Sequence, residues 1–307
     1  MKTTTILVTG GAGNIGSALV RALSLRPNHV ILVADNLSTG SIEKVPLSDN
    51  VHFHNIDVNE FAQVSPLFAK HKINYVFHFA AVVGVKRTLE NPLSVLRDIK
   101  GIENLLELAR ANNISRFYYS SSSEVYGEPF EIPMNEHSTP LNSRLPYAIV
   151  KNVGEAFCRS YQQAYGLSYI NYRFFNTYGP MQSDDFVVPR FLKKAMSNED
   201  IVIFGDGNQT RTFCYVDDNI EACLRAHDTD LFKNETLNIG SDIEFTVNEL
   251  ADTIIKICNS TSKIIHAPAL KEGDMNRRKP DISKMKELLG KSPRSLEEGL
   301  KLLIQHI

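Results

Sequence analysis

The chain has 307 residues, enough for one large domain or two small ones, and a chain of this length can bury roughly two-thirds of its unfolded surface. Its 33 basic and 35 acidic side chains leave a net charge of -2, which argues against nucleic acid or an anionic membrane as a partner. With no CxxC pair and no His/Cys cluster at zinc spacing, we expect no metal site and buried, reduced thiols at Cys158, Cys214, Cys223 and Cys258.

Short β-rich runs alternate with longer segments in which apolar residues recur at i, i+3 and i+4. The first run, "TTTILVTG", is too short for a secretion signal, and no run of about 18 apolar residues follows, so we expect a cytoplasmic protein without a membrane span. The alternation is typical of βαβ units, and nearly continuous apolar strands indicate helices on both faces. We therefore predict an α/β fold with a doubly wound parallel sheet, built on the runs "TILVTG", "HVILVAD", "VHFHNID", "YVFHFAA", "RFYYSSSS" and "SYINYRFF".

After about Asn176 the pattern loosens into loops such as "NTYGPMQSDD" and "FGDGNQTR". A helix near 217–227, a strand "TLNIG" and a mixed tail follow. No Pro/Ser-rich linker separates the parts, so we expect a smaller C-terminal substrate domain interleaved with the sheet domain. The expected sheet domain covers 1–175 and 212–243, and the substrate domain covers 176–211 and 244–307.

A glycine-rich loop follows the first strand and opens a helix, in "VTGGAGNIGSALVRAL". Gly11, Gly13 and Gly16 fit GxGxxG, and Gly10, Gly13 and Gly16 fit a TGxxGxxG variant; both allow the backbone to approach a pyrophosphate at the helix N-terminus. A tight turn without a ligand is the alternative. The second strand ends at Asp35, 19 residues after Gly16, where a carboxylate can bind the ribose hydroxyls of adenosine and repels a 2′-phosphate. The sequence thus predicts a Rossmann domain that binds NAD rather than NADP.

Tyr147 and Lys151 in "LPYAIVK" are spaced i, i+4, which places both on one face of a helix. A free phenol has a pKa near 10, and a neighbouring ammonium lowers it by favouring the phenolate. We therefore predict that Tyr147 accepts the proton of a substrate hydroxyl while a nicotinamide accepts hydride from the same carbon. A surface Tyr/Lys pair is the common alternative for this spacing.

Seven motifs, in the family's order, make essentially the whole chain resemble an extended short-chain dehydrogenase/reductase of the nucleotide-sugar epimerase, dehydratase and decarboxylase branch. They are "TGGAGNIG", "HFAA" at 78–81, "SSSEVYGEP" from Ser121, "YAIVK", "RFFNTYGP" from Arg173, "RTFCYVDD" from Arg211 and "RRKPDISK" from Arg277. The resemblance implies an enzyme in which NAD removes hydride from C4 of a nucleotide sugar to give a transient 4-keto sugar. UDP is the nucleotide that family frequency favours.

The resemblance also implies which residues touch each ligand. Ser122 would hydrogen-bond the 4-hydroxyl beside Tyr147, Asp57 would touch adenine, and Lys151 would hold the nicotinamide ribose. The cofactor-binding residues, besides Tyr147 and Lys151, would be Gly10, Gly13, Asn14, Ile15, Gly16, Asp35, Asn36, Asp57, Val58, Ala80 and Ala81. The substrate-binding residues would be Ser122 and Ser123 near the sugar, Asn176 and Arg211 at the diphosphate, Phe204 beside the base, and Arg278.

Glu124 bears on which reaction follows, and we include it among the catalytic residues. Many 4-epimerases resemble "SSATVYG" here, whereas dehydratases and UDP-glucuronate decarboxylases have Glu where this chain has Glu124. The dTDP-glucose dehydratases also carry Asp where this chain has Ser123. A carboxylate bonded to backbone at the strand end is the alternative role for Glu124, and a surface charge is the alternative for Arg278, which falls where the decarboxylases place their carboxylate-binding arginine.

Other segments resemble different enzymes of this branch. "RTFCYVDD" and "RRKPD" resemble the decarboxylases, but "RLPYAIVK" departs from their "RSCYDEGK", and "AAVVGVKRTLENP" from Ala80 resembles the epimerases. We therefore expect a UDP-sugar 4-epimerase first, a UDP-glucuronate decarboxylase second and a 4,6-dehydratase third. A non-catalytic, NAD-sensing regulator on the same fold is the alternative of a different class.

The resemblance further implies a homodimer. The helix near 92–112 and the one after Tyr147 would pack against their symmetry mates as a four-helix bundle. The same apolar positions could instead face the chain's own sheet: Leu93, Leu96, Ile99, Leu105, Leu106 and Leu108.

Overall fold

The computed structural model describes residues 3–84, 88, 90–268 and 277–306. The chain divides into two compact units by its internal contacts. The first comprises Met1–Val125, Ser143–Arg173 and Cys223–Leu237, and the second comprises Tyr126–Asn142, Phe174–Ala222 and Asn238–Ile307. Residues 126–142, 174–175, 212–222 and 238–243 thus lie in the second unit, whereas we expected them in the sheet domain. The assignment of one domain to the cofactor and the other to the sugar stays a prediction.

A seven-stranded sheet runs through the first unit in the order β11-β6-β5-β4-β1-β2-β3. The ladders that join β1 to β2 and β4, β2 to β3, and β4 to β5 are parallel. All six expected strands form, so the predicted α/β fold with a parallel sheet is confirmed. The strands are β1 Thr4–Thr9, β2 His29–Asp35, β3 Val51–Asn55, β4 Tyr75–His78, β5 Arg116–Ser122, β6 Tyr169–Phe174 and β11 Glu235–Ile239.

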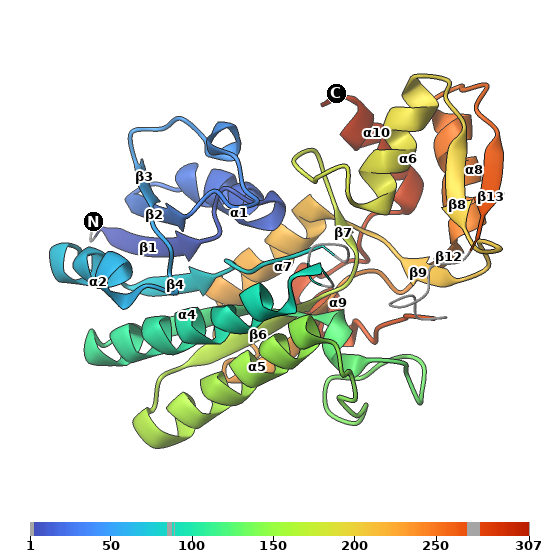
Figure 1. The fold of residues 1–307 in the computed structure, drawn as a ribbon. Helices are drawn as coiled ribbons and strands as arrows, with labels where there is room; N and C mark the ends of the chain where they lie inside the picture. The colour runs from blue at the N-terminus through green and yellow to red at the C-terminus, as the bar shows by residue number, and fades with distance from the viewer. Residues whose placement is uncertain (1–2, 85–87, 89, 269–276, 307) are drawn as a thin grey trace. The chain divides into compact units, whose positions relative to one another are not determined.

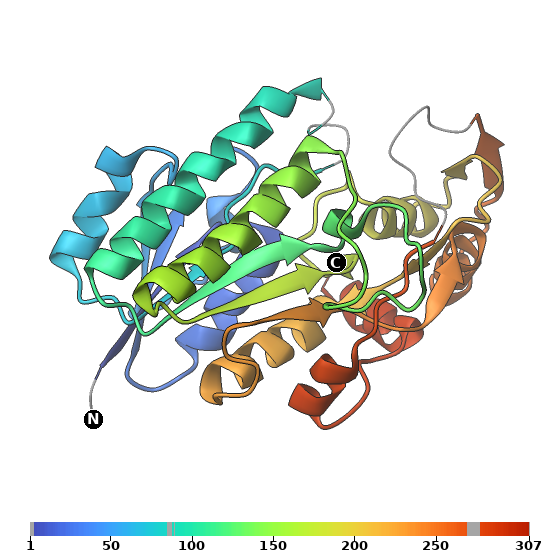
Figure 2. The same cartoon turned by 90° about the horizontal axis from the view of Figure 1, so that it is seen from below.

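Helices cover both faces of this sheet because its strands are apolar on both sides. On one face, α4 (Pro92–Ala111) and α5 (Pro146–Tyr165) run side by side (Figures 1 and 2). Both begin with proline, which suits the first turn, and α5 ends at Gly166 in a left-handed conformation. Three further helices accompany the sheet, namely α1 (Asn14–Ser24), α2 (Phe61–Lys70) and α7 (Val216–Asp228).

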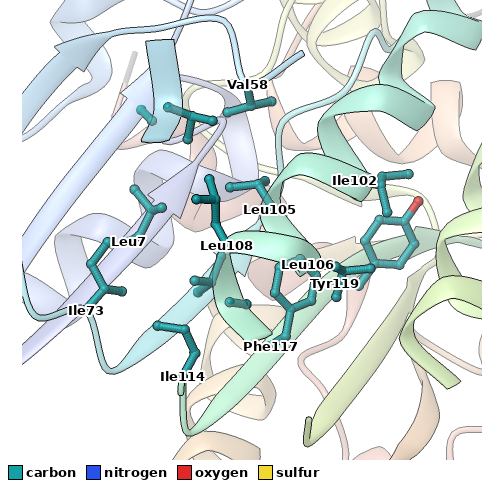
Figure 3. Packing of buried hydrophobic residues seen from close by; sticks show 14 of the residues in the cluster. Leu7, Val58, Ile73, Ile102, Leu105, Leu106, Leu108, Ile114, Phe117 and Tyr119 are labelled. Carbon is teal, nitrogen blue, oxygen red and sulfur yellow. The ribbon is translucent and has the colours of Figure 1, made fainter. Parts of the chain in front are cut away.

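The core beneath α4 fixes this helix against the sheet. The leucines of α4 pack in one cluster with Leu7 of β1, with Ile73 and with Phe117 of β5 (Figure 3). Leu105 and Leu106 are fully buried. Burial of a leucine side chain contributes about 1.5–3 kcal/mol. On the opposite face, Tyr118 of β5 bonds to His227 of α7 at 2.9 Å.

The described residues of the second unit form three two-stranded sheets and a core of their own around Phe191, Leu250 and Leu300. β7 (Thr177–Tyr178) pairs with β10 (Cys214–Tyr215), β9 (Thr210–Thr212) with β12 (Glu244–Thr246), and β8 (Ile201–Phe204) with β13 (Ile264–Ala267). The helices are α6 Val187–Met196, α8 Val247–Ile257, α9 Ser283–Leu289 and α10 Leu296–Ile304. Both α8 and α10 begin with a capping box.

Three of the four cysteines are buried thiols, but Cys258 is partly exposed, which corrects the expectation that all four are buried. Within the described residues, no group of three or more His, Cys, Asp or Glu side chains could hold a metal ion. No helix in the part of the chain that the structure describes is long and apolar enough to cross a membrane.

Candidate active site

The glycine-rich loop turns sharply between β1 and α1. Gly10 has a φ of +69°, and a Cβ there would lie 2.5 Å from the backbone nitrogen of Ala80. A Cβ on Gly16 would overlap the carbonyl oxygen of Gly10. The Gly13 N–H donates to that same carbonyl at 3.0 Å. Glycine is therefore required at two of these positions by backbone sterics alone, before any ligand is considered.

The start of α1 has the features of an anion-binding site. Its N-cap is Gly13, no side chain caps the helix, and the first turn holds no acidic residue. Asn14 and Ile15 are the first two helical residues, and the buried Oδ1 atom of Asn14 has no hydrogen-bond partner. Uncapped N–H groups and the helix dipole favour a phosphate group, so the loop fits the pyrophosphate of NAD.

Asp35 is held against this loop at the end of β2. Its carboxylate accepts the N–H of Ala12 at 3.0 Å and that of Leu37 at 2.8 Å. A carboxylate can accept about four hydrogen bonds, so these two leave capacity for ribose hydroxyls. Its fixed negative charge also fits NAD better than NADP.

The other predicted adenosine-side residues lie at the ends of β2 and β3. The Asn36 amide donates to Asp57 at 3.2 Å, and the N–H of Asn59 donates to Asp57 at 2.9 Å. Val58 is buried, and its carbonyl accepts a bond from Asn104 at 3.0 Å. The structure thus brings Asp35, Asn36, Asp57 and Val58 to one edge of the sheet, as parallel strands require of their carboxyl ends.

Ala80 and Ala81 follow β4, beside the same loop. The Ala80 N–H donates to the Thr9 hydroxyl at 3.3 Å, and Thr9 also bonds to His78 at 2.8 Å. These contacts hold the segment after β4 close to Gly10. The later part of the epimerase-like segment "AAVVGVKRTLENP", namely 85–87 and 89, lies outside the described residues.

Tyr147 and Lys151 lie one turn apart on α5, with the Lys151 ammonium 5.6 Å from the centre of the Tyr147 ring. Lys151 is only 2% exposed and donates to the Ser120 carbonyl at 2.6 Å. Burial lowers the pKa of Lys151 to about 8, while the charge of Asp98 acts in the opposite direction. A buried lysine that is bound to β5 is not a surface residue, which excludes the surface-pair alternative.

Ser122 is the last residue of β5, two positions after the Lys151 anchor at Ser120. Its buried hydroxyl accepts the N–H of Glu124 at 3.2 Å, at the start of a short 3-10 helix, Ser123–Tyr126. Ser123 is buried, whereas Glu124 is partly exposed. The expected cluster of Ser122, Ser123 and Glu124 therefore stands at the carboxyl end of β5, the strand against which α5 packs.

A buried ion pair that the sequence analysis missed links the strands to α5. The Arg173 guanidinium makes a bidentate pair with Glu155, with distances of 2.8 and 2.7 Å, and the Ser121 hydroxyl donates to the same carboxylate at 2.5 Å. Glu155 is completely buried. One signal was available: Glu155 follows Lys151 by four residues, which puts it on the same helix face.

In the second unit, Asn176 and Arg211 occupy neighbouring segments. The Asn176 amide donates to the Thr212 carbonyl at 3.0 Å, and Arg211 donates to the Thr210 carbonyl at 2.7 Å. An isolated bridge joins Thr210 to Arg277, so Arg278 lies on the segment beside β9.

The two adjacent arginines of "RRKPD" have different environments. Arg277 pairs with Glu244 at 2.6 and 2.7 Å, whereas Arg278 is only 5% exposed. Arg278 is thus a buried cation, and the surface-charge alternative is wrong. Phe204 ends β8 in a different small sheet, where its exposed ring lies 5.9 Å from the Arg190 guanidinium. The ligands assigned to all these residues stay predictions.

Known proteins similar to this chain act on nucleotide sugars. A UDP-N-acetyl-alpha-D-glucosaminuronate decarboxylase of Bacillus cytotoxicus is 36% identical, over 97% of this chain and 96% of the relative. A putative UDP-glucose 4-epimerase of Methanocaldococcus jannaschii is also 36% identical, over 97% of each chain. The solved UDP-glucose 4-epimerase of Thermotoga maritima, with UDP-glucose, is 34% identical with a TM-score of 0.92, covering 99% of this chain and 98% of that one.

Relatives of both reaction types thus match over nearly the full length, so the likeness supports an enzyme without deciding between epimerase and decarboxylase. A family model described as the NAD dependent epimerase/dehydratase family matches residues 6–240. This match spans the glycine loop, Asp35 and the Tyr147–Lys151 helix. The chain therefore belongs to the NAD dependent epimerase/dehydratase family, with NAD as its cofactor.

Proposed function

We propose that the protein is a UDP-sugar 4-epimerase that works through a transient 4-keto sugar. The observation that carries this proposal is the buried Lys151 ammonium 5.6 Å from the Tyr147 ring, at the end of the strand that presents Ser122. A binding protein has no need to bury an amine beside a phenol, because burial of a charge is costly. A proton-transfer site gains from it, since the amine stabilises a phenolate.

The chain's own residues supply the proton chemistry. Tyr147 takes the proton of the 4-hydroxyl and later returns it, and Ser122 orients that hydroxyl by a hydrogen bond. Lys151 holds a positive charge beside Tyr147 at neutral pH, because its pKa of about 8 leaves most molecules protonated there. Bound NAD supplies a reversible acceptor for the hydride at C4.

The substrate end of the proposal uses the second unit. Asn176, Arg211 and Arg278 bind the diphosphate, and Phe204 borders the base. The guanidinium of Arg278 supports this role, because its planar set of N–H donors matches the oxygens of a diphosphate. The choice of UDP rests on the names of the three relatives reported above, because each of these names includes UDP.

A UDP-hexuronate decarboxylase is the second candidate. Glu124 at the end of β5 and the buried Arg278 favour it, as does the similarity to the Bacillus decarboxylase. A 4,6-dehydratase of the dTDP-glucose type is third, since Ser123 has no carboxylate to protonate a departing hydroxyl. A non-catalytic NAD sensor is disfavoured by retention of the whole Tyr147, Lys151 and Ser122 arrangement. The cytoplasmic location stays a prediction.

Product analysis separates these candidates. Purified protein with NAD should convert at least one of UDP-glucose, UDP-N-acetylglucosamine and UDP-glucuronate into a sugar of unchanged mass with inverted C4 configuration by NMR. Loss of carbon dioxide would instead identify a decarboxylase, and loss of water a dehydratase. If NAD binds but no new sugar forms at enzyme concentrations near those of the substrate, the protein is a non-catalytic NAD sensor and the catalytic proposal is wrong.

We also propose a homodimer formed by α4 and α5. Leu105, Leu106 and Leu108 are buried within the subunit and are therefore not part of the proposed interface. Three aliphatic side chains remain exposed on these helices at 71%, 38% and 41%, namely Leu93, Leu96 and Ile149. Large exposed apolar residues on adjacent helices are typical of subunit interfaces.

Sedimentation velocity tests the dimer. The wild type is expected to sediment as a dimer, and the Leu93→Glu/Leu96→Glu variant as a folded monomer, because two charges would be buried in the interface. Leu25→Glu, at an 83% exposed leucine after α1, is the control and should stay dimeric. A wild type that is monomeric at all concentrations, or a dimeric double variant, would refute this interface.

A further inference from the structure

The ring of Tyr119 is a neighbour of Lys151 that the proposed chemistry leaves unused. Tyr119 lies on β5, within the buried cluster of Figure 3, one residue before the Ser120 carbonyl that accepts the Lys151 ammonium. The ammonium lies 5.2 Å from the centre of the Tyr119 ring and 5.6 Å from that of Tyr147. Tyr119 is 1% exposed and Lys151 is 2% exposed. Both groups are thus removed from bulk water, the condition under which a cation–π contact is strongest.

The helix α5 leaves room for this ring. The Tyr119 hydroxyl donates to the carbonyl of Val150, the residue before Lys151, at 3.4 Å. A Cβ on Gly154 would lie 2.2 Å from the Tyr119 hydroxyl and from the ring atom Cζ. Glycine is unfavourable inside a helix, and the ring that lies against Gly154 accounts for its presence there. Two contacts with α5 therefore fix the Tyr119 ring beside Lys151.

The other groups around Lys151 are neutral or make no direct bond to it. Burial raises the pKa of the Tyr119 hydroxyl well above its usual value, so this phenol stays neutral. The pKa of buried His78 on β4 is lowered to about 3, mainly by burial, so its ring is neutral at pH 7. The charge of Asp98 on α4 favours the ammonium, but within the described residues no hydrogen bond or ion pair joins Asp98 to Lys151.

A neutral ring suits a lysine that must act on a neighbouring phenol. A buried ammonium tends to release its proton unless a partner replaces the lost water. A carboxylate in contact would replace it, but its negative charge would cancel much of the field that the ammonium exerts on Tyr147. The face of an aromatic ring attracts the cation and carries no net charge. Burial still lowers the pKa of Lys151 to about 8, which leaves most molecules protonated at pH 7.

We propose that Tyr119 is a positioning residue whose ring supports the Lys151 ammonium through a cation–π contact and leaves its full charge available to Tyr147. The catalytic consequence rests on the proposed function, in which activity requires that ammonium. The contact itself does not, because the protonation of Lys151 can be measured without any substrate. The two can therefore fail separately.

Tyr119→Leu is the test, because it removes the ring and retains an apolar side chain. Tyr119→Phe is the matched control, because it retains the ring and loses only the hydroxyl. Without the ring the ammonium is less stable, so the pKa of Lys151 falls and the proton leaves at lower pH. The ¹³Cε NMR signal of labelled lysine, assigned with Lys151→Met, should titrate about one pH unit lower in Tyr119→Leu and within about 0.3 unit of the wild type in Tyr119→Phe.

The pH dependence of turnover gives a second readout. In Tyr119→Leu the alkaline limb of the kcat/KM profile should move to lower pH. The ratio of activity at pH 9 to activity at pH 6.5 should fall by roughly three- to tenfold relative to the wild type. Tyr165→Leu removes an exposed ring at the end of α5, where the Arg110 guanidinium lies 5.1 Å from the ring centre. It should leave the Lys151 titration unchanged.

Tyr119→Met is a second variant without the ring, for use if Tyr119→Leu does not fold. An unchanged Lys151 titration in either folded variant would overturn the proposal. Equal shifts in Tyr119→Leu and Tyr119→Phe would overturn it as well, because they would assign the effect to the hydroxyl. A shift that depends on the ring, in a protein that converts no UDP-sugar, would support the contact and refute the proposed function instead.

Discussion

Replacement of Tyr147 by phenylalanine is expected to lower kcat/KM by about 10² to 10⁴-fold, the usual contribution of a positioned general acid–base group. This loss of activity would come from the missing hydroxyl alone, because the variant retains the ring that packs against the first unit's core. Turnover of whichever UDP-sugar the wild type accepts would be measured by product NMR. The free energy of unfolding should change little.

Tyr165→Phe is the matched control, because it makes the same change at the exposed C-terminal end of α5. It should retain wild-type turnover. If Tyr147→Phe stays within about tenfold of the wild type, which corresponds to roughly 1.4 kcal/mol of barrier, Tyr147 is not the acid–base residue.

Arg173→Met is expected to lower the free energy of unfolding by about 3–5 kcal/mol, the cost of leaving one partner of a buried ion pair alone. Glu155 would stay fully buried without its bidentate partner, with the Ser121 hydroxyl at 2.5 Å and the half-exposed Arg159 guanidinium at 3.7 Å still near it. Because Ser121 precedes Ser122, and Glu155 follows Lys151 by one turn, turnover should also fall. Urea unfolding at pH 7 measures the effect on stability.

Arg26→Met is the control for that measurement. Arg26 makes a similar bidentate pair with Asp228, at 2.5 and 2.8 Å, but both side chains are partly exposed to water. A surface pair of this kind contributes about 0–1 kcal/mol. Equal losses in the two variants would show that burial does not set the energy of the Arg173–Glu155 pair. The double variant Arg173→Met/Glu155→Leu should recover much of the loss, because it removes the stranded charge.

Local patterns predicted the sheet and the glycine loop well, because their causes are local. The apolar strands must be covered on both sides, and Gly10 and Gly16 are fixed by contacts within the turn or with the segment just after β4. Asp35 could be placed for the same reason, since the end of β2 lies beside the loop that follows β1.

Residues whose environment depends on distant segments could not be placed. Nothing in "RRKPD" distinguishes Arg277, which pairs with Glu244, from the buried Arg278. The partners Arg173 and Glu155 are 18 positions apart and meet because β6 and α5 pack on the same strand.

The most direct test of the central claim follows a deuterium label at C4 of the UDP-sugar that the protein converts. If Tyr147 takes only the hydroxyl proton and hydrogen at C4 moves as hydride within the site, the 4-epimer should retain the deuterium at C4 with inverted configuration. Exchange of that deuterium with water, or conversion without any change at C4, would contradict the account.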